Sequence, residues 1–175
     1  MKHNIKITII LIAMFLITQI IGLFVINFYE ISNNELPYGM EPPEEINTQT
    51  SIISILFAFA LAITLFFVLT RIKAEKFIRL WFFVVTIIAI GLTINAFLLF
   101  LFKNPPNPYE YISILVLIIA IPLAYFKIFR RNLLVHNFTE LLIYPGIAAV
   151  FVPILNILGI IILLLAISLY DIWAV

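Results

Sequence analysis

Residues 80–102 form the run LWFFVVTIIAIGLTINAFLLFLF, which contains no charged side chain. A helix needs about 20 mostly apolar residues to cross about 30 Å of hydrocarbon, so this run predicts a membrane-spanning helix. The same argument applies to three more uncharged runs, at residues 7–28, 51–70 and 111–126. We expect each of these runs to cross the membrane once.

The last apolar stretch, residues 138–175, is too long for a single crossing. As one helix it would extend about 57 Å at 1.5 Å per residue, nearly twice the hydrocarbon thickness. Pro153 and Gly159 predict a break, because proline removes a backbone donor and glycine tolerates the dihedral angles of a tight turn. We therefore expect a fifth helix over residues 138–155 and a sixth over residues 158–175.

The composition of the whole chain agrees with a membrane protein. Hydrophobic residues make up 65% of it and charged residues 11%, with a mean hydropathy of +1.22, whereas a soluble domain is about half apolar and about a quarter charged. A net charge of +1 offers no basic surface for nucleic acid. Without cysteine and with only two histidines, a metal centre is not expected. The sequence predicts an all-α, polytopic transmembrane bundle of six helices, forming one domain over residues 1–175 in the lipid bilayer.

Basic residues give the predicted orientation. Nine of the ten lie before the first predicted helix, between the second and third, or between the fourth and fifth. Only Lys103 lies in another connection. Because cytoplasmic loops carry an excess of lysine and arginine, we expect an integral, multi-pass protein with a cytoplasmic N-terminus.

Asp171 is the only aspartate, and it lies inside the sixth predicted helix. It follows Gly159 by about 18 Å of helix. An aspartate at a helix centre costs about 3 kcal/mol to insert, and the group would lower that cost by staying protonated. Ser168 and Ala174 share its face, so a neighbouring helix or water could approach. Asp171 is therefore the main functional candidate, and the alternative is a helix-end residue that reaches interfacial water.

The pair Tyr170-Asp171, followed two residues later by Ala174-Val175, resembles the first catalytic motif of the presenilin and signal peptide peptidase family. Archaeal presenilin-like members, with compact chains and short loops, are the most similar. In that family a Tyr-Asp pair on the sixth helix faces a Gly-x-Gly-Asp motif on the seventh, and a Pro-Ala-Leu motif follows on the ninth. The resemblance covers the whole chain in topology and its last few residues in motif.

The resemblance implies an intramembrane aspartyl protease that cleaves transmembrane helices or remnant signal peptides, in the plasma membrane of an archaeon. Asp171 would be one of two catalytic carboxyls, Tyr170 would orient or pack it, and no cofactor is implied. The chain lacks both Gly-x-Gly-Asp and Pro-Ala-Leu, and an aspartyl site needs two carboxyls that share one proton. We therefore expect a six-helix N-terminal part, truncated before further helices that would be its partners and carry the second aspartate.

Two other functions remain open from the residues. Asp171 could serve as a proton or ion relay in a transporter, or the chain could be a noncatalytic scaffold subunit. Folding back the last hairpin places Glu140 within about 3 Å of the depth of Asp171, so the two could pair.

The remaining polar residues favour structural roles. Asn137 followed by Glu140 has the spacing of a helix N-cap and its third residue, which favours capping over the pairing with Asp171. His136 is expected in a solvated loop. Interhelical hydrogen bonds are the expectation for the amides Gln19, Asn27 and Asn95.

Overall fold

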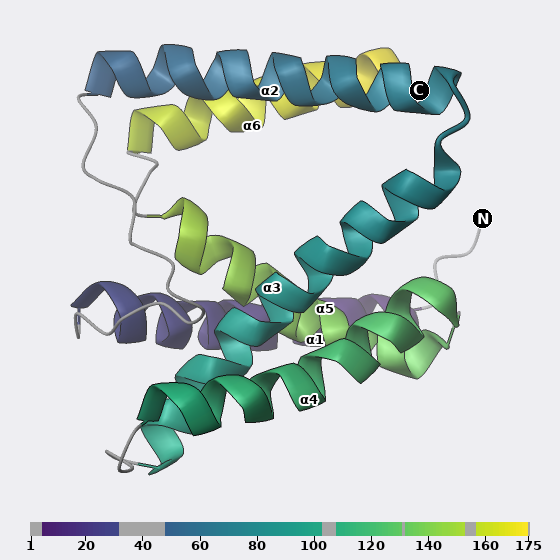
Figure 1. Ribbon diagram of the computed structural model, residues 1–175. Coiled ribbons are helices and arrows are strands. Elements are labelled where there is room, and N and C mark those ends of the chain that lie inside the picture. Colours follow the sequence, from purple (N-terminus) through teal and green to yellow (C-terminus); the bar gives the residue numbers. More distant parts are fainter. Residues whose placement is uncertain (1–4, 32–47, 103–107, 131, 153–156, 175) are drawn as a thin grey trace. The chain divides into compact units, whose positions relative to one another are not determined.

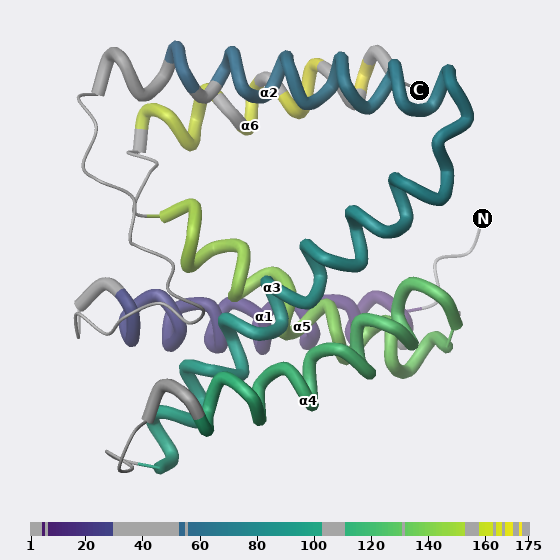
Figure 2. The backbone as a smooth tube through the Cα atoms, viewed as in Figure 1, coloured from purple at the N-terminus to yellow at the C-terminus, as the bar shows by residue number. Residues whose placement is uncertain are grey.

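The computed structural model describes residues 5–31, 48–102, 108–130, 132–152 and 157–174. Within these ranges a few side chains, those of Tyr170 and Asp171 among them, lie outside the described part (grey in Figure 2). The described elements are six α-helices and a short π-helix, which confirms the all-α class (Figure 1). They are α1 (Ile5–Ile26), η1 (Asn27–Ile31), α2 (Thr48–Arg71), α3 (Glu75–Phe102), α4 (Pro108–Phe129), α5 (Leu133–Phe151) and α6 (Ile157–Ala174).

Several helices continue past the apolar runs that predicted them. The third helix starts at Glu75 rather than at residue 80, with the acid in the first turn where the helix dipole favours negative charge. The fifth helix ends at Phe151, four residues before the expected bound, and the sixth begins at Ile157. Pro153 lies outside the described residues, and Gly159 lies inside α6 instead of at the break.

Four of the described helical stretches are long and apolar enough to cross a membrane unaided. These are Ile7–Tyr29, Glu75–Phe102, Tyr111–Phe129 and Leu133–Phe151. In α2 and α6 the apolar stretches are shorter, Leu56–Arg71 and Leu158–Leu169. Helix length and composition thus indicate a multi-pass membrane protein, while the six crossings and the side of the N-terminus stay predictions.

The helices form two compact units that alternate along the sequence. Unit 1 consists of Met1–Pro42 and Arg79–Ala149, and unit 2 of Pro43–Ile78 and Val150–Val175. Unit 1 therefore holds α1, most of α3, α4 and most of α5, and unit 2 holds α2 and α6.

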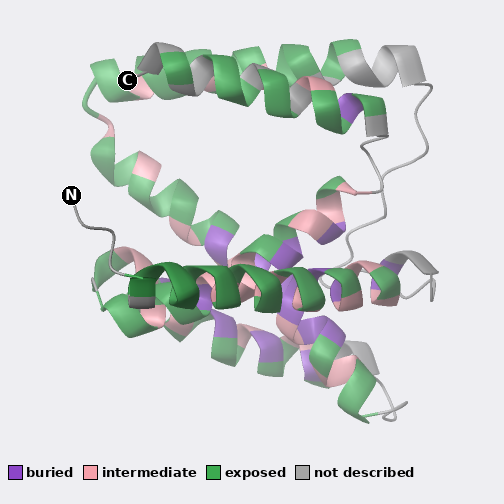
Figure 3. Cartoon of the chain, turned by 180° about the vertical axis from the view of Figure 1, so that it is seen from behind, coloured by how far each residue is buried: buried purple, intermediate pink, exposed green. Residues whose placement is uncertain are grey.

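Helix α3 carries much of the core of unit 1. Its buried residues run from Thr86 to Ala96, and in Figure 3 the buried positions gather on this helix and on parts of α4 and α5. Aromatic rings join its neighbours to it: Phe24 of α1 stacks on Phe97 at 4.9 Å between ring centroids, and Phe83 meets Phe129 of α4 at 5.6 Å. Most of α1 beyond these contacts is exposed, as expected of a helix that faces lipid.

Helices α3 and α5 cross in close backbone contact. Gly146 lies so near the backbone of Ala89 that a Cβ on the glycine would meet the Ala89 carbonyl. Beside it the Thr93 hydroxyl donates a hydrogen bond to the Leu142 carbonyl at 2.7 Å. Pro145 has no amide hydrogen, so the helical donor is missing at the neighbouring carbonyl of Leu141, four residues before the proline. Small residues and hydroxyls are the usual means by which membrane helices associate.

A second polar contact ties η1 to α3. The Tyr29 hydroxyl donates to the Leu92 carbonyl at 2.8 Å and accepts from the Asn95 amide nitrogen at 3.0 Å. Both side chains are buried. The predicted interhelical hydrogen bond of Asn95 is thus confirmed, whereas Gln19 and Asn27 are exposed.

Unit 2 pairs α2 with α6. Helix α2 ends in a tight turn at Lys73, whose φ of 56° lies in the left-handed region. The Lys73 amide bonds the Thr70 carbonyl at 3.0 Å and the Ala74 amide bonds the Leu69 carbonyl at 2.9 Å. This is the Schellman pattern of a helix end, and it leads directly into α3.

Candidate active site

Asp171 and Tyr170 lie near the C-terminal end of α6, in helical backbone. Asp171 is about 21 Å along the axis from the first residue of the helix. No basic residue occupies the last turn of α6. Their side chains lie outside the described part, so the roles expected for them stay predictions.

The face of α6 around this pair is open. Ser168 is exposed, and Leu169 and Ile172 are 68% and 74% exposed. In a membrane helix, exposed apolar side chains of this kind contact lipid or another helix. The described side chains on this part of α6 are therefore accessible to lipid or to another helix.

A second carboxylate does not come from the helix that contacts α6. Helix α2 contains no acidic residue. Among the described side chains of unit 2 the one carboxylate is Glu75, which is exposed at the start of α3. In the described part of unit 2, α2 therefore offers no second carboxylate beside α6.

Glu140, the candidate partner in the sequence, has two cationic or basic neighbours in unit 1. Its Oε1 lies 3.5 Å from Lys127 Nζ and 3.0 Å from His136 Nε2. The Lys127 side chain is 13% exposed and that of Glu140 32%. This pairing links α4 to α5, and a contact between Glu140 and Asp171 stays a prediction.

The expected capping role of Asn137 and Glu140 is wrong. Helix α5 begins at Leu133, and its cap is Asn132, whose side-chain oxygen accepts from the Leu134 amide at 3.0 Å. The first helical hydrogen bond runs from the His136 amide to the Asn132 carbonyl at 2.9 Å. The loop expected at His136 is therefore also wrong, because this residue lies in the first turn of α5.

A groove runs between α1 and α5 in unit 1. Its larger part has a volume of about 400 Å³ and is mostly apolar, with Glu140 and Tyr144 on one wall and Gln19 on the other. A smaller part of about 100 Å³ continues past Gly22. No group of three histidine, aspartate or glutamate side chains in the described residues could hold a metal ion.

Sequence reasoning missed the close crossing of α3 and α5. Pro145 and Gly146 lie inside α5, and the glycine allows the backbone of α3 to approach. The signal was present in α3, where Ala89 and Thr93 have the four-residue spacing of small side chains at a helix contact.

Comparison with known proteins identifies a family. The profile of the family described as signal-peptide peptidase, presenilin aspartyl protease matches residues 12–175. The match thus covers nearly the whole chain and includes the Tyr170-Asp171 pair. No curated protein and no solved structure matches the chain.

Proposed function

The chain belongs to the family of signal-peptide peptidases and presenilin aspartyl proteases, and we propose that it forms the N-terminal part of an intramembrane protease that cuts transmembrane helices or remnant signal peptides. The observation that carries this proposal is the family match over residues 12–175, which contains the Tyr170-Asp171 pair on α6. The alternatives of a transporter relay or a scaffold subunit are not favoured by that match.

Asp171 supplies one of the two carboxyls of the proposed mechanism. In an aspartyl site the ionised member activates water and the protonated member polarises the scissile carbonyl, so both are needed. Asp171 is the only aspartate of this chain, and α2 offers no acid beside it. The second carboxyl then comes from partner helices that carry the second aspartate, and Tyr170 orients or packs Asp171.

The substrate is a helix in lipid, which sets two requirements. Its backbone amides are hydrogen-bonded within the helix, so the segment to be cut must unwind locally before water can attack. Water must also reach membrane depth. The exposed face of α6 at Ser168, Leu169 and Ile172 supports this proposal, because it leaves space for the partner helix and the substrate near Asp171.

We also propose the orientation that the basic residues favour, with six crossings and a cytoplasmic N-terminus. It places the C-terminal end of α6, and therefore Asp171, nearer the cytoplasmic side. The archaeal plasma membrane is the location that the resemblance implies.

The test is cleavage of a labelled transmembrane peptide by membranes that contain the full-length gene product. Asp171→Asn should abolish cleavage, because an amide cannot ionise or share the proton. Glu140→Gln is the matched control, since it removes a carboxylate that pairs with Lys127 and His136, and it should leave cleavage in place. Normal cleavage by the Asp171→Asn variant would remove the assignment.

A further inference from the structure

We propose that the turn between α2 and α3, with the groove on α2 beside it, binds an anionic membrane lipid. Arg71 and Lys73 hold the lipid phosphate, and an acyl chain lies along Thr64, Phe67 and Val68. This site goes beyond the proposed protease and does not depend on it.

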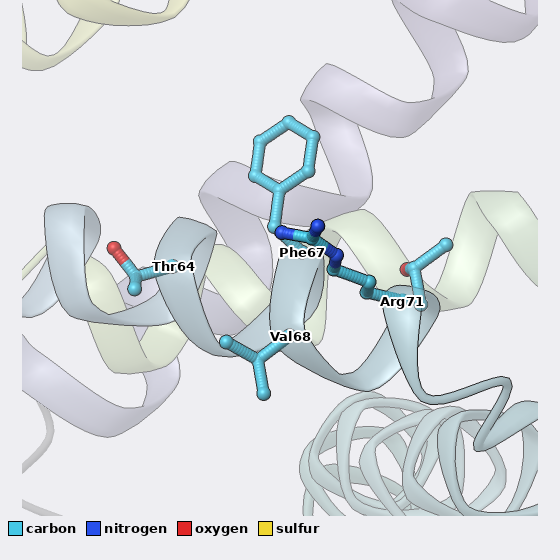
Figure 4. Close-up of a pocket in the computed structure, with 5 residues that line it drawn as sticks. Thr64, Phe67, Val68 and Arg71 are labelled. Carbon is cyan, nitrogen blue, oxygen red and sulfur yellow. The ribbon is translucent and has the colours of Figure 1, made fainter.

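The groove lies where an apolar helix ends. It has a volume of about 420 Å³ and is lined by Thr64, Phe67, Val68, Thr70 and Arg71, all from α2. Figure 4 shows the side chain of Arg71 extending back toward Phe67, and both residues line the groove. The apolar stretch Leu56–Arg71 stops at this arginine, which is the position at which a spanning helix meets lipid headgroups.

The charged side chains of the turn are suited to binding an anion. Arg71, Lys73 and Lys76 are exposed, with Glu75 as the acid among them. None of the three basic side chains forms an ion pair with a carboxylate in the described part of the chain. A guanidinium binds phosphate through two parallel hydrogen bonds, and a nearby ammonium adds a point charge.

Other donors near the groove are already used. The hydroxyls of Thr64 and Thr70 donate to the Ala60 and Phe66 carbonyls, each at 2.8 Å. These bonds turn the hydroxyl protons toward the helix backbone. The groove wall is therefore effectively apolar and suits a hydrocarbon chain, while the phosphate depends on the basic side chains.

The backbone amides of the turn are also already hydrogen-bonded. The amides of Ile72, Lys73 and Ala74 all donate to carbonyls of α2, so no anion-binding nest of free amides exists there. Lys73 holds the left-handed conformation that glycine adopts with less strain. The Lys73 side chain thus strains the turn while it supplies a cation. Replacing Lys73 with glycine should therefore weaken lipid binding and raise the stability of the chain.

The test is native mass spectrometry of the purified full chain in detergent, titrated with phosphatidylglycerol or with phosphatidylcholine of the same acyl chains. We expect tighter binding of phosphatidylglycerol. One basic residue near an anionic surface contributes about fivefold in affinity, so Arg71→Gln and Lys73→Gly should each weaken phosphatidylglycerol binding by about that factor. Phosphatidylcholine binding should fall less, because the choline cation already offsets the attraction between its phosphate and the basic side chains. Thermal unfolding should show Lys73→Gly to be at least as stable as the parent chain.

Two further variants make the result specific. Arg130→Gln removes an exposed cation that stands over the Phe126 ring in the other unit, and it should leave the affinity for phosphatidylglycerol within about twofold of the parent. Thr64→Phe fills the groove and should weaken binding of both lipids. Equal affinity for the two lipids, an equal effect of Arg130→Gln and Arg71→Gln, or no effect of Thr64→Phe would each overturn the proposal.

Discussion

Replacing Gly146 with alanine tests the closest contact in unit 1. The added Cβ would lie 2.7 Å from the carbonyl carbon of Ala89 and closer still to its oxygen. Ordinary contact begins at 3.4 Å, so the two helix backbones must separate by at least about 0.7 Å, because no flexible side chain can give way. Overpacking costs about 1–3 kcal/mol, and a rigid obstacle favours the upper end. The better helix propensity of alanine returns up to about 1 kcal/mol, leaving a loss of about 2 kcal/mol.

Gly22→Ala is the matched control, because a Cβ there meets no atom within 4 Å. It should raise the stability of the chain by up to about 1 kcal/mol, since alanine is the better helix former. Titration of both variants with a denaturing detergent, followed by tryptophan fluorescence, measures the difference in unfolding free energy. If Gly146→Ala proves as stable as Gly22→Ala, the close approach of α5 to α3 is wrong.

A double-mutant cycle tests whether α3 and α5 move apart in the Gly146→Ala variant. In the parent chain, Thr93→Val removes the hydrogen bond to Leu142 and should cost about 1 kcal/mol. In the Gly146→Ala background the two helices have already moved apart, so the same change should cost almost nothing. The full cost in both backgrounds would show that the helices do not separate, which would refute this explanation of the alanine effect.

Three further changes should alter stability in stated directions. Tyr29→Phe should lower the unfolding free energy by about 1–2 kcal/mol, because it leaves the buried amide of Asn95 without its acceptor; an unchanged detergent titration would contradict this. Asn132→Ala should cost about 1 kcal/mol by removing the cap of α5, whereas Asn137→Ala should not have a capping effect, and circular dichroism during unfolding distinguishes the two. Lys73→Gly should raise the melting temperature, since relief of the left-handed conformation is worth about 1 kcal/mol.

Hydropathy predicted all six helices because each contains an uninterrupted apolar run. It placed several helix ends wrongly, because a helix continues into polar residues as long as its backbone hydrogen bonds can form, as at Glu75. The cap of α5 shows the same limit. Asn132 and Asn137 are both plausible caps by residue type, and only the chain path decides between them.

The tertiary contacts were harder to predict. The sequence predicts that Glu140 contacts residues one turn away on its own helix. Its pairing with Lys127 cannot be predicted in this way, because it depends on how α4 and α5 pack. The family, by contrast, could be predicted from the sequence because the Tyr170-Asp171 pair occurs on the sixth predicted helix, and the family match over residues 12–175 confirms it. The chemistry expected of those two residues stays a prediction.

The alternation of the two units along the sequence bears on how the protein is made. Helix α2 leaves the ribosome about 100 residues ahead of the end of α6, the helix that it contacts. At 5–20 residues per second this delay is about 5–20 seconds. During that time α3, α4 and α5 of the other unit are synthesised, so we expect nascent α2 to remain beside the insertion machinery until α6 emerges. Site-specific crosslinking of stalled nascent chains of increasing length would detect its release.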